Sequence, residues 1–122
     1  MSGFPEVDRH LEVASALLEG RFRVGPVPAM RAACWFTRRG LEALLPVLLD
    51  RRGLQLGTSN TRTRLICLAV TYSDQAERAN DLVSAWDQLS EACHHHAYEL
   101  TPTLGEARDL LGRVRAGRNL TS

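Results

Sequence analysis

The clearest helical pattern in this chain lies in the segment DQAERANDLVSAWDQLSEACHHH, residues 74–96. Apolar and small side chains recur there at intervals of three and four residues, which places them on one face of an α-helix. Ser73 or Asp74 can cap the start of this helix. The expected core face consists of Ala79, Leu82, Val83, Trp86, Leu89, Cys93 and His96. We therefore expect the central core helix of the protein in this segment.

Two helices are expected before it. Residues 5–19 have one apolar face and are followed by Gly20, a residue that commonly ends helices. After a linker over residues 21–27, a proline opens a second helical pattern over residues 28–52. Pro46 lies inside this pattern, where its missing N–H predicts a bend or an early end. The apolar series of the second helix comprises Met30, Ala33, Cys34, Thr37, Leu41, Leu44, Leu45 and Leu48.

Two more helices complete the expected set. Ser59 or Asn60 can cap a short helix that places Leu65, Leu68, Ala69 and Tyr72 on one face. Thr103 and Glu106 have the spacing of a capping box, in which each side chain satisfies the other's backbone N–H. The helix that follows runs to about Ala116, with Leu104, Ala107, Leu111 and Val114 turned inward. Residues 1–4 and 117–122 are expected to be flexible.

The composition fits one helical domain over residues 1–122. The chain is 44% hydrophobic and 24% charged, which is ordinary for a globular protein. No segment alternates apolar and polar residues as a half-buried strand does. The predicted fold is all-α, an antiparallel bundle of four main helices plus one short helix. No apolar run approaches the roughly 20 residues that a membrane-spanning helix needs, so no membrane association is expected.

The cysteines, the N-terminal sequence and the net charge indicate the expected cellular location and the expected binding to nucleic acid. Cys34, Cys67 and Cys93 are odd in number and fall on the apolar sides of different expected helices, where reduced cysteines act as small hydrophobes. The N-terminus contains acidic residues and no apolar signal core, so we expect a cytoplasmic protein. The net charge of +1 provides no global field for nucleic acid, although a local patch can still bind it.

Three of the four histidines stand together at residues 94–96. Successive helical residues point about 100° apart, so these side chains cannot all face one ion or substrate. His94 and His95 each have Glu91 nearby on the helix, which suits a general acid or base and equally suits a solvated helix face. His96 lies beside the core stripe and is most simply a buried, hydrogen-bonded histidine.

Metal and cofactor sites are not expected. Cys93 and His96, three residues apart, share an edge of the helix and raise the alternative of a zinc site. A closed structural zinc site needs four ligands, and the chain offers no second pair of this kind. The phosphate-binding and dinucleotide-binding glycine motifs are also absent from the sequence.

Two arginine groups stand out on other helices. Arg31, Trp35 and Arg38 follow one another at spacings of four and three. Tryptophan and arginine are enriched in binding hot spots, so the group predicts an interface. The alternative is a pair of surface charges around a partly buried tryptophan, with Arg38 and Glu42 forming a minor ion pair. Arg62 and Arg64, at a helix start, are candidates for binding phosphate or carboxylate.

Three blocks of sequence carry a family resemblance: MRAACWFTRRGLEALL (30–45), TRTRLICL (61–68) and WDQLSEACHHHAYELTPT (86–103). In these blocks the chain resembles the HEPN superfamily, and in particular small actinobacterial HEPN-like proteins. The resemblance implies a bundle of four or five helices that often forms a homodimer. In active members it implies a metal-independent ribonuclease whose site is composed across the dimer.

Active members of that superfamily pair an arginine with a histidine four to six residues later. His94, His95 or His96 can supply the histidine, but residues 87–92 read DQLSEA and contain no arginine. The resemblance therefore implies a non-catalytic binding or regulatory module, conceivably in a toxin–antitoxin or phage-defence system. The alternative is a metal-independent endoribonuclease in which His94 or His95 acts with Arg62 or Arg64.

The expected contact residues are Arg31, Trp35 and Arg38, together with a polar cluster that includes Tyr98 and Glu99 beside the histidines. The expected partners are a second copy of the chain, a further protein, and RNA or a nucleotide.

Overall fold

The computed structural model describes residues 4–93 and 101–121. Within these residues the regular structure is entirely helical, which confirms the all-α prediction. The elements are α1 (Pro5–Leu18), α2 (Pro26–Arg51), α3 (Thr61–Thr71), the single 3₁₀ turn η1 (Ser73–Gln75), α4 (Ala76–Cys93) and α5 (Leu104–Gly117). None of the helices in this part of the chain combines the length and the apolar character needed to cross a bilayer.

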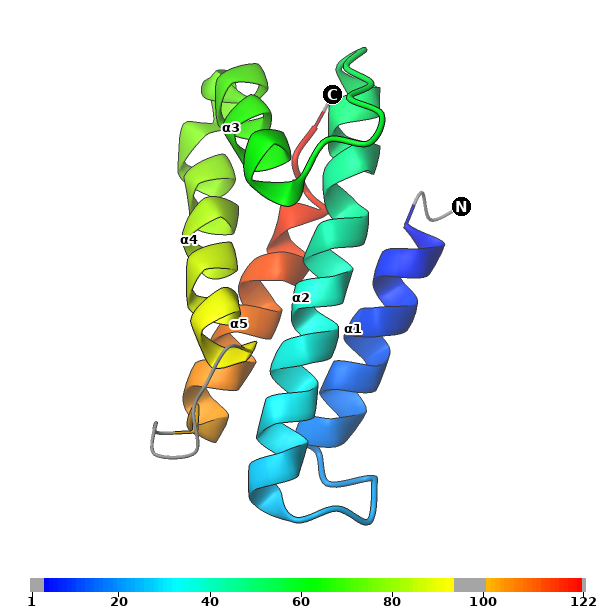
Figure 1. Ribbon diagram of the computed structural model, residues 1–122, viewed down its shortest axis with the longest axis vertical. Helices are drawn as coiled ribbons and strands as arrows, with labels where there is room; N and C mark the ends of the chain where they lie inside the picture. Colours follow the sequence, from blue (N-terminus) through cyan, green and yellow to red (C-terminus); the bar gives the residue numbers. More distant parts are fainter. Residues whose placement is uncertain (1–3, 94–100, 122) are drawn as a thin grey trace.

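The helix at the centre of the molecule is α2. It packs against α1, α3, α4 and α5, and Figure 1 shows α1, α4 and α5 lying alongside it with α3 at one end. Its 26 residues extend over about 39 Å, long enough to meet all the other helices. The prediction that residues 74–96 form the central helix is therefore wrong, because α2 packs extensively against every other α-helix, whereas no extensive contact joins α4 to α1 within the described residues.

The ends of α2 also differ from the prediction. The helix begins at Pro26, with Gly25 as its N-cap, and it continues through Pro46 to Arg51. Pro46 is exposed, so water can solvate the carbonyl that loses its hydrogen bond, and the helix does not end early. Gly53 follows with a φ of 76°, a conformation that favours glycine and turns the chain away.

The contact between α1 and α2 depends on a glycine. Val7, Leu11 and Ala14 of α1 are buried against the core. At Gly40 of α2, an added Cβ would lie 2.6 Å from Cδ2 of Leu11. The absence of a side chain at this position therefore allows the two helices to approach closely.

Local capping signals place α3 and α5 as predicted. The backbone N–H of Thr63 donates to Oδ1 of Asn60 at 2.8 Å. The capping box is complete, because Glu106 N–H donates to Oγ1 of Thr103 and Thr103 N–H donates to Oε1 of Glu106, both at 3.1 Å. Leu104, predicted to face inward, is 38% exposed because it lies in the first turn of α5, at the end of the molecule, whereas Leu110 is buried.

The segment after α5 packs against the rest of the molecule. Gly117 is buried and Leu120 is only 1% exposed, although residues 117–122 are expected from the sequence to be flexible. Arg118 pairs with Asp8 of α1. The described part of this segment therefore contributes to the core.

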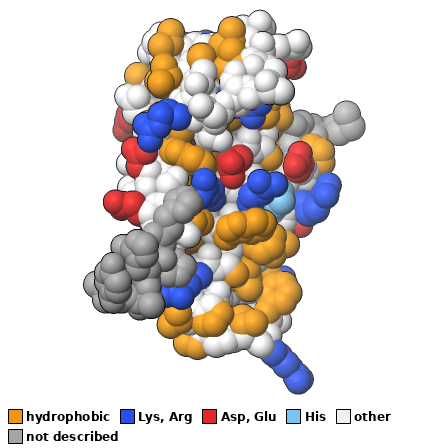
Figure 2. Space-filling view, in the orientation of Figure 1, with side chains coloured by type: hydrophobic (Ala, Val, Ile, Leu, Met, Phe, Trp, Pro, Cys, Tyr) orange, Lys and Arg blue, Asp and Glu red, His pale blue; other side chains and the backbone are white. Residues whose placement is uncertain are grey.

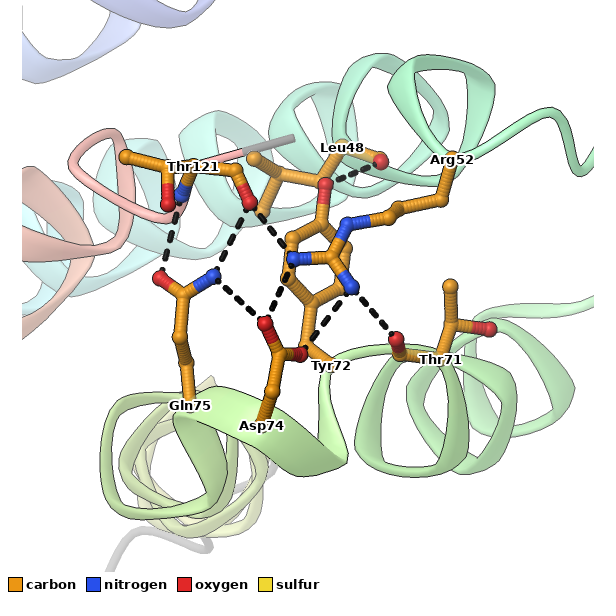
Figure 3. Close-up of polar contacts among 7 residues, drawn as sticks. All are labelled: Leu48, Arg52, Thr71, Tyr72, Asp74, Gln75 and Thr121. Atoms are coloured by element: carbon orange, nitrogen blue, oxygen red, sulfur yellow. Dashed lines mark hydrogen bonds and ion pairs between the residues drawn. The ribbon is translucent and has the colours of Figure 1, made fainter.

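Arg52 joins the end of α2 to this segment (Figure 3). Its guanidinium donates to the carbonyl oxygens of Thr71 and Thr121 at 2.9 and 2.7 Å and to both carboxylate oxygens of Asp74. It also stacks over the ring of Tyr72 at 4.1 Å. Hydrogen bonding from Arg52 holds the pKa of Asp74 below its usual value. We assign this cluster a structural role, since it holds three segments of the chain together.

Candidate interaction surface

One stripe of side chains along α2 is exposed or partly buried toward the N-terminal end of the helix and buried toward its C-terminal end. Leu45 and Leu49 of this stripe are buried toward the C-terminal end of α2, the end beside which α3 lies (Figure 1). Toward the N-terminal end, the same stripe carries side chains that are exposed or only partly buried: Val27, Arg31, Trp35, Arg38 and Glu42. The spacings of three and four residues place all of these positions on one side of the helix. The stripe thus passes from core into surface within a single element.

Trp35 is the large apolar side chain of the exposed part. It is 48% exposed, and its ring meets Phe36 edge to face with centroids 4.9 Å apart. The guanidinium of Arg39 lies 5.6 Å from the centre of the Trp35 ring. Sequence reasoning named Arg38 as a neighbour and missed Arg39, although its spacing of four residues from Trp35 is the signal for this contact.

Arg38 packs against α4. Its guanidinium lies 4.5 Å from the centre of the ring of Trp86, a buried residue of α4. The predicted ion pair with Glu42 is present at 3.9 Å, a long separation for a partly exposed pair. Glu42 also accepts a hydrogen bond from Oγ1 of Thr61 at 3.4 Å. Arg38 therefore stabilises a contact between helices in addition to bordering the surface.

Arg31 lies one turn before Trp35 on the stripe. Its side chain is partly buried, and its Nε has no hydrogen-bond partner among the described residues. A buried donor without a partner is costly, so this atom favours an additional acceptor.

The thiol groups near this region are protonated at neutral pH. Burial raises the pKa of Cys34 to about 11. Burial also raises the pKa of Cys93, and the hydrogen bond and charge of Arg38 oppose that rise. Neither thiol is an activated nucleophile, because nucleophilic cysteines have lowered pKa values. Arg38 thus lies beside Cys93, the residue that directly precedes the three histidines in the chain.

The remaining predicted site residues are only partly located. His94, His95, His96, Tyr98 and Glu99 lie outside the described residues. Among the residues that are described, no group of three or more histidine, cysteine and carboxylate side chains is placed to hold a metal ion.

Arg62 and Arg64 do not form one site. Arg64 donates to the carbonyl oxygen of Gly57 at 2.7 Å and so anchors the loop before α3. Arg62 instead lines a groove between α3 and α4, which Ile66 and Asp87 also line. The structure therefore does not bring the two guanidinium groups together as a phosphate clamp.

Figure 2 shows how side chains are distributed over the face that carries α2. Charged side chains of both signs cross the middle of the view, and hydrophobic side chains gather below them, over the N-terminal half of α2 and the loop before it. The apolar part of this face is thus bordered by charge.

No family model, curated protein or solved structure matches this chain. What the protein does is therefore inferred from its own surface. The accessible stripe of α2 around Trp35 is the feature that most resembles a binding site.

Proposed function

We propose that this protein is a non-catalytic binding module that pairs with a second copy of itself through the N-terminal half of α2. The observation that carries the proposal is the exposure of Trp35, at 48%, on a stripe whose continuation at Leu45 and Leu49 is core. A second α2 stripe packed at this position would bury the exposed half as well.

The composition of the surface suits such a contact. Interface hot spots are enriched in tryptophan and arginine, and losing one commonly costs about 2 kcal/mol or more of binding energy. Trp35 lies between Arg31 and Arg39 on the surface of α2. A two-fold contact brings identical patches together, so the arginines of one copy can stack on the indole of the other. The net charge of +1 gives little repulsion between copies.

The resemblance to the HEPN superfamily also supports a binding module that forms a homodimer. The arrangement of α1, α2, α4 and α5 alongside one another supports an antiparallel bundle of four main helices with α3 as the short helix (Figure 1). Arg64 donates its hydrogen bond to the loop before α3. This contact favours a binding function over an endoribonuclease in which Arg64 takes part in catalysis. A regulatory place in a toxin–antitoxin or phage-defence system, and any RNA or nucleotide partner, are implied by the resemblance alone.

The test is sedimentation velocity of the wild type and of Trp35→Ala over a wide concentration range. We expect the wild type to dimerise and Trp35→Ala to raise the dimer dissociation constant by about 30-fold or more. Ile66→Ala is the matched control, because Ile66 is also exposed, at 61%, but lies on α3 outside the stripe. It should leave the dissociation constant unchanged.

A wild-type protein that stays monomeric, or a Trp35→Ala variant that dimerises as tightly as the wild type, would contradict the proposed surface. The same preparations are incubated with total RNA in excess chelator. Cleavage that is lost on replacing both His94 and His95 with alanine would overturn the non-catalytic proposal and favour the metal-independent ribonuclease.

A further inference from the structure

An open pocket lies at the end of the molecule where α2 and α5 begin. Its volume is about 520 Å³, and every side chain that lines it is uncharged. The main apolar contributors are Leu18, Val24, Val27, Met30, Pro102 and Leu104. Pockets of this size and character are typical binding sites.

The apolar side chains of the pocket are accessible to a ligand. Val24, Val27 and Leu104 are 50%, 45% and 38% exposed, and Phe22 in the same loop is 48% exposed. Exposed apolar side chains scattered singly need no explanation, but several around one hollow indicate a binding site. The hydrophobic area at the lower end of Figure 2 covers the same loop and the start of α2.

Among the described residues, the charged side chains next to the lining residues in the chain are mainly positive. Arg23 is exposed and has no ion pair within the described residues. Arg31 follows the lining residue Met30 in the chain, and its side chain is partly exposed. In the described part of the chain, the carboxylates closest in sequence to the lining residues are already engaged, since Glu19 accepts from Nε of Arg21 at 2.8 Å and Glu106 closes the capping box. The first turn of α2 contains no acidic residue, so the positive end of its helix dipole adds to this potential.

From these features we infer that the pocket binds an acidic amphipathic segment of a partner protein. Apolar side chains of that segment enter the hollow, and its carboxylates meet Arg23 and Arg31. An amphipathic helix that lays apolar anchors into a hydrophobic groove is a common mode of peptide recognition. A concave pocket suits inserted side chains, whereas a lipid surface suits a protruding apolar face.

The experiment uses the full chain and a fluorescent synthetic peptide of about 18 residues, long enough to form a helix. The peptide has leucine at helical spacing and glutamate at the other positions, and a second peptide has lysine in place of every glutamate. Binding is followed by fluorescence anisotropy. We expect the glutamate peptide to bind at least about tenfold more tightly than the lysine peptide.

Substitutions in and near the pocket test whether the peptide binds there. Val24→Ser and Leu104→Ser should each weaken binding of the glutamate peptide by about tenfold, because each removes an accessible apolar contact. Arg23→Glu should weaken the glutamate peptide and strengthen the lysine peptide. The matched controls are Ile66→Ser and Arg62→Glu in the groove between α3 and α4, which should bind as the wild type does.

Val27 and Arg31 belong to both surfaces, so dimerisation should compete with the peptide. Trp35→Ala, which weakens the dimer, should therefore bind the peptide at least as tightly as the wild type does, and this separates the two proposals. The inference is overturned if the glutamate peptide fails to bind, if the lysine peptide binds as tightly, or if only the control variants weaken binding. It is also overturned if vesicles of anionic lipid bind the protein through Val24 and Leu104 while the peptide does not.

Discussion

At the scale of single residues, Cys34 and Cys93 differ from free cysteine through loss of contact with water. Burial disfavours the charged thiolate, so the pKa of each rises. For Cys93 the nearby guanidinium of Arg38 acts in the opposite direction. The reactivity of the two thiols therefore reports directly on packing around α2 and α4.

We predict that Cys34 is alkylated by iodoacetamide about 100-fold more slowly than a free cysteine at pH 8. A pKa near 11 leaves the group almost wholly protonated at that pH, and its alkylation rate should rise about tenfold per pH unit. Arg38→Met should raise the pKa of Cys93 further and slow its alkylation several-fold. Mass spectrometry of labelled peptides gives the rates.

Arg39→Met serves as the control for this prediction, because Arg39 stacks on Trp35 and is not among the groups that shift the pKa of either thiol. If Arg38→Met left the labelling of Cys93 unchanged, the proposed electrostatic contact would be wrong.

At the scale of helices, glycine positions show which contacts between elements are tight. Gly40 lies where α1 meets α2, and an added Cβ there would also lie 3.2 Å from Cγ of Leu11. Gly112, on the exposed side of α5, has nothing within 4 Å of the position where its Cβ would stand. The same substitution should therefore have opposite effects at the two positions.

We predict that Gly40→Ala lowers the free energy of unfolding by about 1–3 kcal/mol, because overpacking outweighs the better helix propensity of alanine. Gly112→Ala should raise it by about 0.5–1 kcal/mol, since propensity acts there alone. Urea denaturation measures both. A stabilised Gly40→Ala variant would show that α1 and α2 are less closely packed than the distance to Leu11 requires.

At the scale of the whole molecule, the described C-terminal segment is part of the core. Leu120 is 1% exposed, and the carbonyl oxygen of Thr121 accepts from both Arg52 and Gln75. These contacts join residues more than 40 positions apart in the chain, so they form only when the helices have assembled.

We predict that Leu120→Ala lowers the free energy of unfolding by about 2–4 kcal/mol, as expected for a buried leucine. Leu104→Ala is the comparison, and its smaller burial should limit the loss to about 1 kcal/mol. Equal, small losses in the two variants would mean that the segment after α5 does not contribute to stability.

The sequence by itself determined the helical class, the stop after α1 and the caps of α3 and α5. These features depend on side chains within a few residues, as with Thr103 and Glu106 in the capping box. Only the tertiary structure decided that α2 is the central helix and that Arg38 packs on Trp86. It also decided that Leu120 is buried. Periodicity identifies an apolar face but not the partner that covers it, because that choice depends on contacts between residues far apart in the chain.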